Sequence, residues 1–251
     1  MLQGLNGLLG QYRLSRGELL HARRGPILKD EPHFSRALFK FLNELAINND
    51  RDWFQENKER YEAVVRQPAL RFVSDVGPRL EKISPYFLAD PRPVGGSLMR
   101  IYRDIRFSKD KSPYKTNIGF YFKYEVPGTS VAGPGLYLHL DPGQSFAGGG
   151  FWHADGETLA KVRNAIVTRP KQWQRVLDKV SVSGEKLKRP PSGFDAGHAF
   201  VEDLKKKDFI ASTRFTQSQV CGRDFISDFA AACKSMSPLL EFLGGAMGLP
   251  W

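Results

Sequence analysis

Cysteine is scarce in this sequence: Cys221 and Cys233 are the only two among 251 residues. This excludes the small secreted proteins that depend on several disulfides. If both thiols lie on one C-terminal helix, a rise of about 1.5 Å per residue separates them by about 18 Å, which is too far for a disulfide. Neither thiol has a cysteine or histidine partner nearby, so they also make a poor zinc site. We therefore expect a reducing, cytoplasmic location, with no metal and no cofactor.

Long apolar runs are absent as well. A membrane-spanning helix needs about 18 or more consecutive apolar residues, and no stretch of this sequence approaches that length. The mean hydropathy is −0.38, while 41% of the residues are hydrophobic and 12% are aromatic. These values exclude a disordered or fibrous chain, because enough apolar side chain is present to build a core. We expect a folded protein without a membrane partner.

Acidic residues are outnumbered, with 27 Asp and Glu against 37 Lys and Arg, which gives a formal net charge of +10. Residues 1–30 show no periodicity, and Glu18 is their only acid up to Gly25. The basic residues in that stretch are Arg13, Arg16, Arg23 and Arg24. We interpret residues 1–30 as a basic N-terminal extension that is disordered or reflects a mis-assigned start, with an organellar transit segment as the alternative. We expect residues 31–251 to form one domain.

Helical spacing begins after Pro32, where apolar residues recur every three or four positions through residues 34–45. A second helix is predicted from Asn49 or Asp50 to Tyr61, because either polar side chain can cap a helix. A third begins near Pro68. Helical spacing returns in residues 156–180, which Pro170 divides into two helices, and again in residues 216–243.

Between these helical regions the apolar spacing changes to every second residue, which is typical of strands. The alternating stretches are residues 98–107, 118–124 and 136–140, followed by the glycine-rich residues 146–152. Their connections are too short for crossover helices, so the strands should pair antiparallel. The predicted fold class is α+β: a single domain with an antiparallel meander sheet flanked by helices.

Positive charge is concentrated between Met99 and Lys123, where seven basic residues face two acids. We call residues 100–116 the basic segment. Arginine forks, lysines and hydroxyl groups together suit a phosphate or carboxylate. The predicted ligand-binding residues are Arg100, Tyr102, Arg103, Asp104, Arg106, Lys109, Lys111, Tyr114 and Lys115. The alternative is a solvated hairpin loop whose arginines pair with carboxylates.

Two further blocks supply supporting candidates. The first block is Asp50, Arg51, Asp52 and Trp53. These residues either face the basic segment or serve as an ordinary helix cap and core anchor. A cap and an anchor explain Arg51 least well. Asp50 and Asp52, together with Asp104, could also hold a metal, although we expect none.

His139 and Asp141 share a strand face in the predicted sheet, so they could act as a base with its orienting partner or as two metal ligands. His153 and Asp155 repeat this spacing, next to Trp152 and the glycines at 148–150. Asp141 is also typical of a turn, and Asp155 is typical of the start of a helix. No further His or Cys spacing reinforces the metal or catalytic reading. His139 and Trp152 are therefore supporting candidates only.

Three blocks of the sequence resemble one protein family. They are residues 41–61 with Asn49-Asp50-Arg51-Asp52-Trp53-Phe54, residues 100–116, and Gly148-Gly149-Gly150-Phe151-Trp152. The family is a conserved, mainly bacterial one with fungal members, catalogued as domain of unknown function 2461. The resemblance covers about Phe34 to Leu243. It implies a shared fold unit and a site built from these blocks, and it implies no reaction.

Four functions are compatible with these residues. We favour binding of a small phosphate-bearing or other anionic molecule, because the basic residues sit in one compact stretch. The alternatives are a hydrolase or transferase that uses Asp104, Asp110 or His139 on an anionic substrate, a nucleic-acid-binding protein, and an internal ion-pair network that fixes the sheet.

Overall fold

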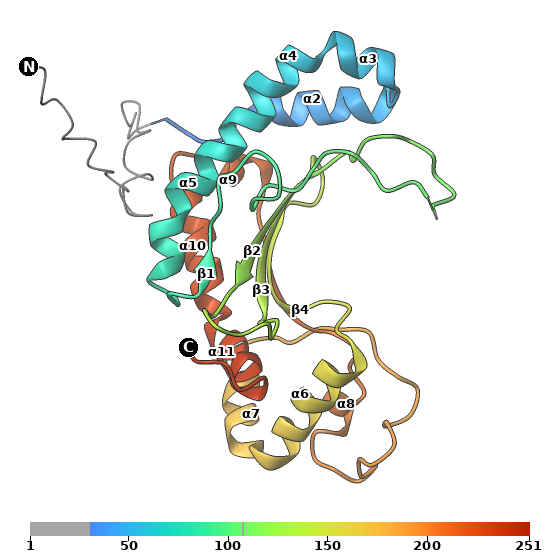
Figure 1. Cartoon of the computed structure of the whole chain (residues 1–251), viewed down its shortest axis with the longest axis vertical. Helices are drawn as coiled ribbons and strands as arrows, with labels where there is room; N and C mark the ends of the chain where they lie inside the picture. Colours follow the sequence, from blue (N-terminus) through green and yellow to red (C-terminus); the bar gives the residue numbers. More distant parts are fainter. Residues whose placement is uncertain (1–30, 107) are drawn as a thin grey trace, which may run out of the picture. The chain divides into compact units, whose positions relative to one another are not determined.

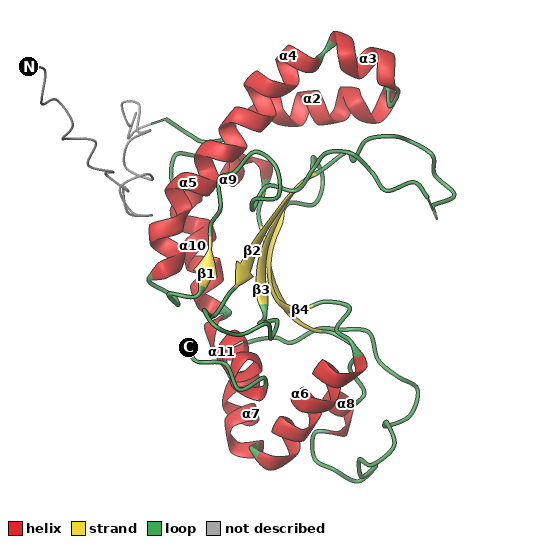
Figure 2. Ribbon diagram, in the orientation of Figure 1, coloured by secondary structure: helices red, strands yellow, loops and turns green. Residues whose placement is uncertain are grey.

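The computed structural model of the protein describes residues 31–106 and 108–251 (Figure 1). The predicted N-terminal extension, residues 1–30, lies outside the described residues. Residues 32–251 form one compact unit that combines helices with a five-stranded sheet. The predicted fold class, a single α+β domain with an antiparallel sheet flanked by helices, is confirmed (Figure 2).

The unit opens with helices, as the apolar spacing predicts. Asp50 caps the second of them, since its carboxylate accepts a 2.8 Å hydrogen bond from the Trp53 N–H. A π turn lies directly before Pro68, which has no N–H to donate and whose ring would clash with a carbonyl in a regular α-helix. The elements are α2 (Arg36–Ile47), α3 (Arg51–Glu56), α4 (Lys58–Tyr61), the π-helix η1 (Glu62–Arg66) and α5 (Gln67–Glu81).

The sheet is fully antiparallel, and its strands lie in sequence order, which confirms the predicted meander. Tyr121 pairs with Tyr137, and Tyr137 pairs with Gly148, so these residues share one face. The strands are β1 (Phe87–Leu88), β2 (Ile118–Tyr124), β3 (Gly135–Leu140), β4 (Phe146–Phe151) and β5 (Phe209–Arg214). A helical insertion separates β4 from β5 in the sequence.

The predicted strand over residues 98–107 is wrong: this stretch is extended chain with only two isolated bridges, Leu98 to Phe120 and Tyr102 to Tyr114. The Asp104 carboxylate accepts a 3.2 Å hydrogen bond from the Arg106 N–H, which competes with pairing to a strand. Asp110 accepts in the same way from the Ser112 N–H. Phe107 lies outside the described residues.

The second helical half also differs in detail from the expectation. The predicted division at Pro170 is confirmed. The single helical region expected over residues 216–243 is instead three helices, and Pro238 stands in the first turn of the last one, where its missing N–H costs nothing. The elements are α6 (Gly156–Thr168), α7 (Pro170–Leu177), α8 (Val201–Leu204), α9 (Gln217–Val220), α10 (Phe225–Ser235) and α11 (Ser237–Ala246).

One face of the sheet carries the core. Phe120, Phe122, Leu136 and Leu138 are fully buried there. Helices α5 and α10 contact each other and the sheet, and α11 contacts β4, on the same side of the strands (Figure 1). The opposite face carries half-buried and exposed side chains, with Tyr121 41% exposed. Both cysteines are free thiols, Cys221 half-buried and Cys233 buried, and they do not share one helix: Cys221 caps the end of α9, whereas Cys233 lies in α10.

None of the helices among the described residues is both long enough and apolar enough to cross a membrane.

Candidate functional site

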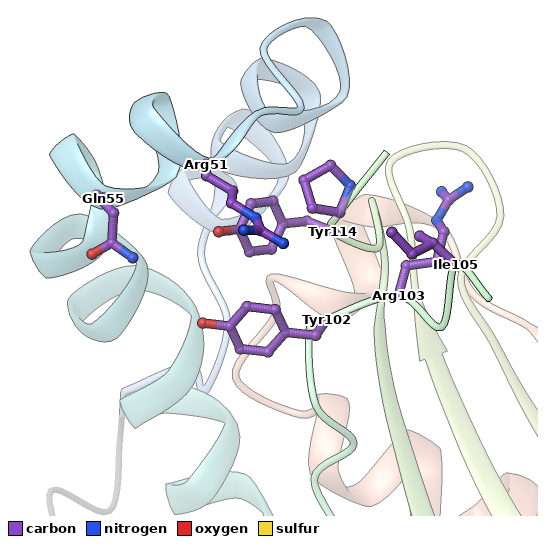
Figure 3. A pocket seen from close by; sticks show the side chains of 7 residues that line it. Arg51, Gln55, Tyr102, Arg103, Ile105 and Tyr114 are labelled. Atoms are coloured by element: carbon purple, nitrogen blue, oxygen red, sulfur yellow. The ribbon is translucent and has the colours of Figure 1, made fainter. Parts of the chain in front are cut away.

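The basic segment meets α3 at an open cleft of about 370 Å³, which we call the first cleft (Figure 3). Its lining comes from two parts of the chain that are about fifty residues apart in the sequence. Helix α3 contributes Arg51 and Gln55. The basic segment contributes Tyr102, Arg103, Ile105, Pro113 and Tyr114. Four of the predicted site residues, Arg51, Tyr102, Arg103 and Tyr114, therefore line one space.

Asn49, immediately before α3, holds the two parts together. Its amide donates to the Tyr114 carbonyl at 3.0 Å and accepts from the Tyr114 N–H at 3.1 Å. The Tyr114 ring then stacks on Phe54 of α3, with 4.1 Å between ring centroids and 19° between planes. Trp53 packs against the Phe41 ring in the core, 5.7 Å away. The position of α3 against the basic segment is thus fixed by paired hydrogen bonds and a ring stack.

Two tyrosine rings form the walls of the first cleft. Tyr102 is 52% exposed, and its ring centroid lies 5.3 Å from that of Tyr114, which is almost fully buried. Burial raises the pKa of Tyr114, with a further rise from Tyr102, so the hydroxyl stays protonated at neutral pH. Figure 3 shows both hydroxyls on the same side of the cleft, toward the helix that carries Gln55. They can donate hydrogen bonds to an oxygen-rich ligand.

Arg51 is the charge at the centre of this arrangement. In Figure 3 its guanidinium lies beside the Tyr114 ring and above the Tyr102 ring. No carboxylate of the described residues lies within 4.0 Å of it. A guanidinium without a carboxylate partner keeps its five donors available to a ligand.

Two arginines of the basic segment, Arg103 and Arg106, are paired with carboxylates. Arg103 forms an ion pair with Asp110, and Figure 3 shows its guanidinium directed away from the two tyrosine rings. Arg106 grips Asp104 with two hydrogen bonds, at 3.0 and 2.7 Å. The hydrogen bond from Arg106 lowers the pKa of Asp104 to about 2, so this carboxyl is ionised at neutral pH.

The lysines of the basic segment lie outside the lining of the first cleft. Lys111 donates to the Ile105 carbonyl at 3.0 Å, and Lys109 is exposed. Lys115 is half-buried, and burial lowers its pKa, with a smaller contribution from Arg100. Arg100 and Lys115 have no carboxylate within 4.0 Å among the described residues. Arg51, Arg100 and Lys115 therefore carry positive charge that no carboxylate of the described residues pairs with.

The remaining predicted site residues are not brought to the first cleft. Asp50 is occupied as the cap of α3, and Asp52 is exposed in its first turn. His139 lies on β3, where its Nδ1 is 3.0 Å from the Tyr137 hydroxyl and its ring stacks on Phe146. Trp152 follows β4 and is 73% exposed. Among the described residues, no three His, Cys, Asp or Glu side chains gather where they could hold a metal ion.

Four residues of the site are missing from the predicted set: Gln55, Ile105 and Pro113, which line the cleft, and Asn49, which positions it. Gln55 lies four positions after Arg51, so on a helix both side chains occupy the same face, and this spacing could have identified it. The sequence around Asn49 predicts a helix cap. Its pairing with Tyr114, 65 positions away, cannot be predicted from the neighbouring residues.

These observations define the class: an α+β protein with an arginine- and tyrosine-lined cleft between a short helix and an irregular basic segment. The chain belongs to the conserved hypothetical protein family DUF2461, whose match covers residues 37–242 and includes both sides of the first cleft. No curated protein and no solved structure matches the chain.

Proposed function

We propose that the protein binds a small phosphate-bearing or other anionic molecule in the first cleft. The observation that carries this proposal is Arg51, whose guanidinium meets the Tyr102 and Tyr114 side chains at an open cleft and has no carboxylate partner in the described chain. Arginine can hold a phosphate or carboxylate through two parallel hydrogen bonds. The tyrosine hydroxyls would complete the coordination.

The exposed ring of Tyr102 supports a ligand with a flat or apolar part next to its anionic group. Offset stacking of aromatic groups contributes about 0.5 to 1.5 kcal/mol beyond simple burial. Ile105 and Pro113 add apolar surface to the same lining. An aromatic phosphate ester therefore matches both the charge and the apolar area of the first cleft.

Binding is favoured over catalysis because the carboxylates near the cleft are engaged. Asp104 is held by Arg106, and Asp110 by Arg103 and Ser112. An acid whose pKa is about 2 cannot donate a proton at neutral pH. His139 is not among the lining residues.

A small molecule is favoured over nucleic acid because the arginine and tyrosine side chains surround one cleft. A nucleic-acid track would need a longer stripe of basic and aromatic side chains. The salt dependence of the affinity distinguishes these two ligand classes. A nucleic-acid complex should lose affinity by orders of magnitude between about 50 and about 200 mM salt, whereas a small anion held by arginine should lose much less.

The test is isothermal titration of the full chain with phenyl phosphate. We expect Arg51→Ala to weaken binding at least about tenfold, because a charge-assisted hydrogen bond contributes about 1.5 to 3 kcal/mol. Lys58→Ala is the matched control, since Lys58 is an exposed cation of the adjacent α4 outside the cleft lining. Equal affinity in Arg51→Ala and the unmodified protein would contradict the proposal. Steep salt dependence with length-dependent binding of oligonucleotides would show that the ligand class is nucleic acid.

A further inference from the structure

A second cleft of about 420 Å³ lies where the chain leaves β4 and enters α6. Its lining is partly apolar, through Ala154, Leu159 and Leu187. The polar and charged lining residues are His153, Arg163, Glu185, Lys207 and Asp208. None of these residues lines the first cleft. The second cleft therefore needs a separate explanation.

Asp208 organises the backbone around this cleft. Its carboxylate is 5% exposed and accepts hydrogen bonds from the His153 N–H at 2.7 Å and the Glu185 N–H at 3.4 Å. A side chain at Gly184 would place its Cβ 2.0 Å from the Asp208 carbonyl oxygen, so only glycine permits this approach. Two loops that are distant in the sequence are thereby fixed against one residue.

His153 is held in a strained conformation by this arrangement. Its φ angle is 51°, and it is the only residue other than glycine with a positive φ in the described chain. Such conformations persist only where the surroundings enforce them, and they concentrate at binding and catalytic sites. The strain at His153 points to a function for the second cleft.

Arg163 supplies buried positive charge to the second cleft. It is 7% exposed, and its Nε and Nη2 donate to the carbonyls of Leu204 and Lys206 at 2.7 and 2.9 Å. Its Nη1 makes no hydrogen bond to a protein atom of the described residues, and no carboxylate there lies within 4.0 Å of it. Two carbonyls therefore hold the guanidinium in place, and its Nη1 is available to donate to a ligand.

An exposed aromatic ring stands next to His153, which lines the second cleft. Trp152 is 73% exposed, and its ring centroid lies 4.4 Å from that of His153, which lines the cleft. An exposed tryptophan is available to stack on a ligand ring.

The charges of the lining determine which anion fits. Arg163 and Lys207 are balanced by Glu185 and Asp208, and Lys207 pairs with Glu185 at 3.0 Å. A doubly charged phosphate would be repelled by the two carboxylates, while a singly charged carboxylate can use Arg163 alone. We propose that the second cleft binds a small aromatic carboxylate, with its carboxylate on Arg163 and its ring against Trp152 and His153.

The experiment measures binding of 4-fluorobenzoate to the full chain by fluorine NMR line broadening. We expect the unmodified protein to bind it, and to bind the neutral analogue 4-fluorobenzyl alcohol at least about tenfold more weakly. Trp152→Ala should weaken binding about fivefold or more, because it removes the exposed ring. Arg163→Lys should weaken it about tenfold, because lysine keeps the charge and loses the fork.

Two controls make the result specific to the second cleft. Lys161→Ala removes a half-buried cation of α6 that pairs with Glu157 and does not line the cleft, and it should leave 4-fluorobenzoate binding unchanged. An Arg51→Ala background is the second control, because it removes binding of the probe at the first cleft and leaves the binding that the second cleft contributes. If Arg163→Lys does not fold, binding to the Trp152→Ala protein and binding of the neutral analogue still test the proposal. Equal binding of acid and alcohol, or no effect of Trp152→Ala, would overturn the proposal.

Discussion

Each cleft has an arginine in its lining and an exposed aromatic ring at or next to that lining, Tyr102 in the first and Trp152 beside His153 in the second, yet the clefts differ in charge. The first cleft has Arg51 and Arg103 in its lining and no acidic residue. The second has Arg163 and Lys207 together with Glu185 and Asp208. A cleft with excess positive charge suits a dianion, and a balanced one suits a monoanion. The charge of the full lining, more than the presence of an arginine, sets the expected ligand.

The clefts also differ in how they are held together. Side chains assemble the first one, through the amide of Asn49 and the stack of Tyr114 on Phe54. Backbone assembles the second, through the N–H groups that Asp208 binds and the close approach at Gly184. Substitutions should therefore damage the clefts separately.

The largest expected effect is that of Tyr114→Ala on the first cleft. Removing a buried aromatic side chain costs about 3 to 5 kcal/mol of unfolding free energy, and phenyl phosphate binding should be lost with it. Chemical denaturation and isothermal titration measure the two effects. Tyr102→Ala is the control, since its ring is 52% exposed and its loss should weaken binding with little change in stability. A Tyr114→Ala protein as stable as Tyr102→Ala would contradict this account.

Asp208→Ala should break the second cleft at a smaller cost. It leaves the partly buried N–H groups of His153 and Glu185 without their acceptor, which we expect to cost about 1 to 3 kcal/mol. Binding of 4-fluorobenzoate should disappear, while phenyl phosphate binding should persist. Asp195→Ala is the matched control, because Asp195 accepts from the Gly197 N–H in an exposed turn. Loss of both ligands from Asp208→Ala would show that the clefts are not independent.

Asn49→Ala tests the link between α3 and the basic segment. We expect a loss of about 1 to 2 kcal/mol, because the N–H and carbonyl of Tyr114 lose their partner. Phenyl phosphate affinity should fall even though Asn49 does not line the cleft. Asn48→Ala, which removes only a hydrogen bond to the Glu44 carbonyl within the same helix end, is the control. Equal phenyl phosphate affinity in the two variants would contradict the positioning role.

Local features of the fold could be predicted from the sequence because local chemistry determines them. Asp50 caps a helix and Pro170 separates two, as their side chains require. The alternation of apolar residues identifies β2 and β3. Apolar and polar residues alternate equally well in residues 98–107. This stretch nevertheless forms no strand, because the carboxylates of Asp104 and Asp110 accept hydrogen bonds from nearby N–H groups. Alternation alone does not reveal that competition.

The candidate sites depend on pairings that no short stretch encodes. Arg51 stands out in the sequence because a cap and a core anchor explain its neighbours and leave it unexplained. Its meeting with Tyr102 depends on Asn49 and Tyr114, which are 65 positions apart. The second cleft depends on His153 and Asp208, 55 positions apart. Sequence reasoning could select the residue types, and tertiary structure decides which of them meet.

The smallest expected effect is a difference in pH dependence between the clefts. The second ionisation of a phosphate ester has a pKa of about 6, whereas a carboxylic acid ionises near pKa about 4. On the protein side, burial raises the pKa of Tyr114, and arginines stay charged, so neither changes state near neutral pH. Between about pH 5 and about pH 7.5 only the phosphate ester therefore gains charge.

Because the dianion interacts more strongly with Arg51, phenyl phosphate affinity should rise about threefold to tenfold over that range and then level off. Affinity for 4-fluorobenzoate should not rise over that range, since its carboxylate is already ionised. Isothermal titration at several pH values measures the first and fluorine NMR the second. A phenyl phosphate affinity that stays flat, or falls as the pH rises, would contradict the assignment of the dianion to the first cleft.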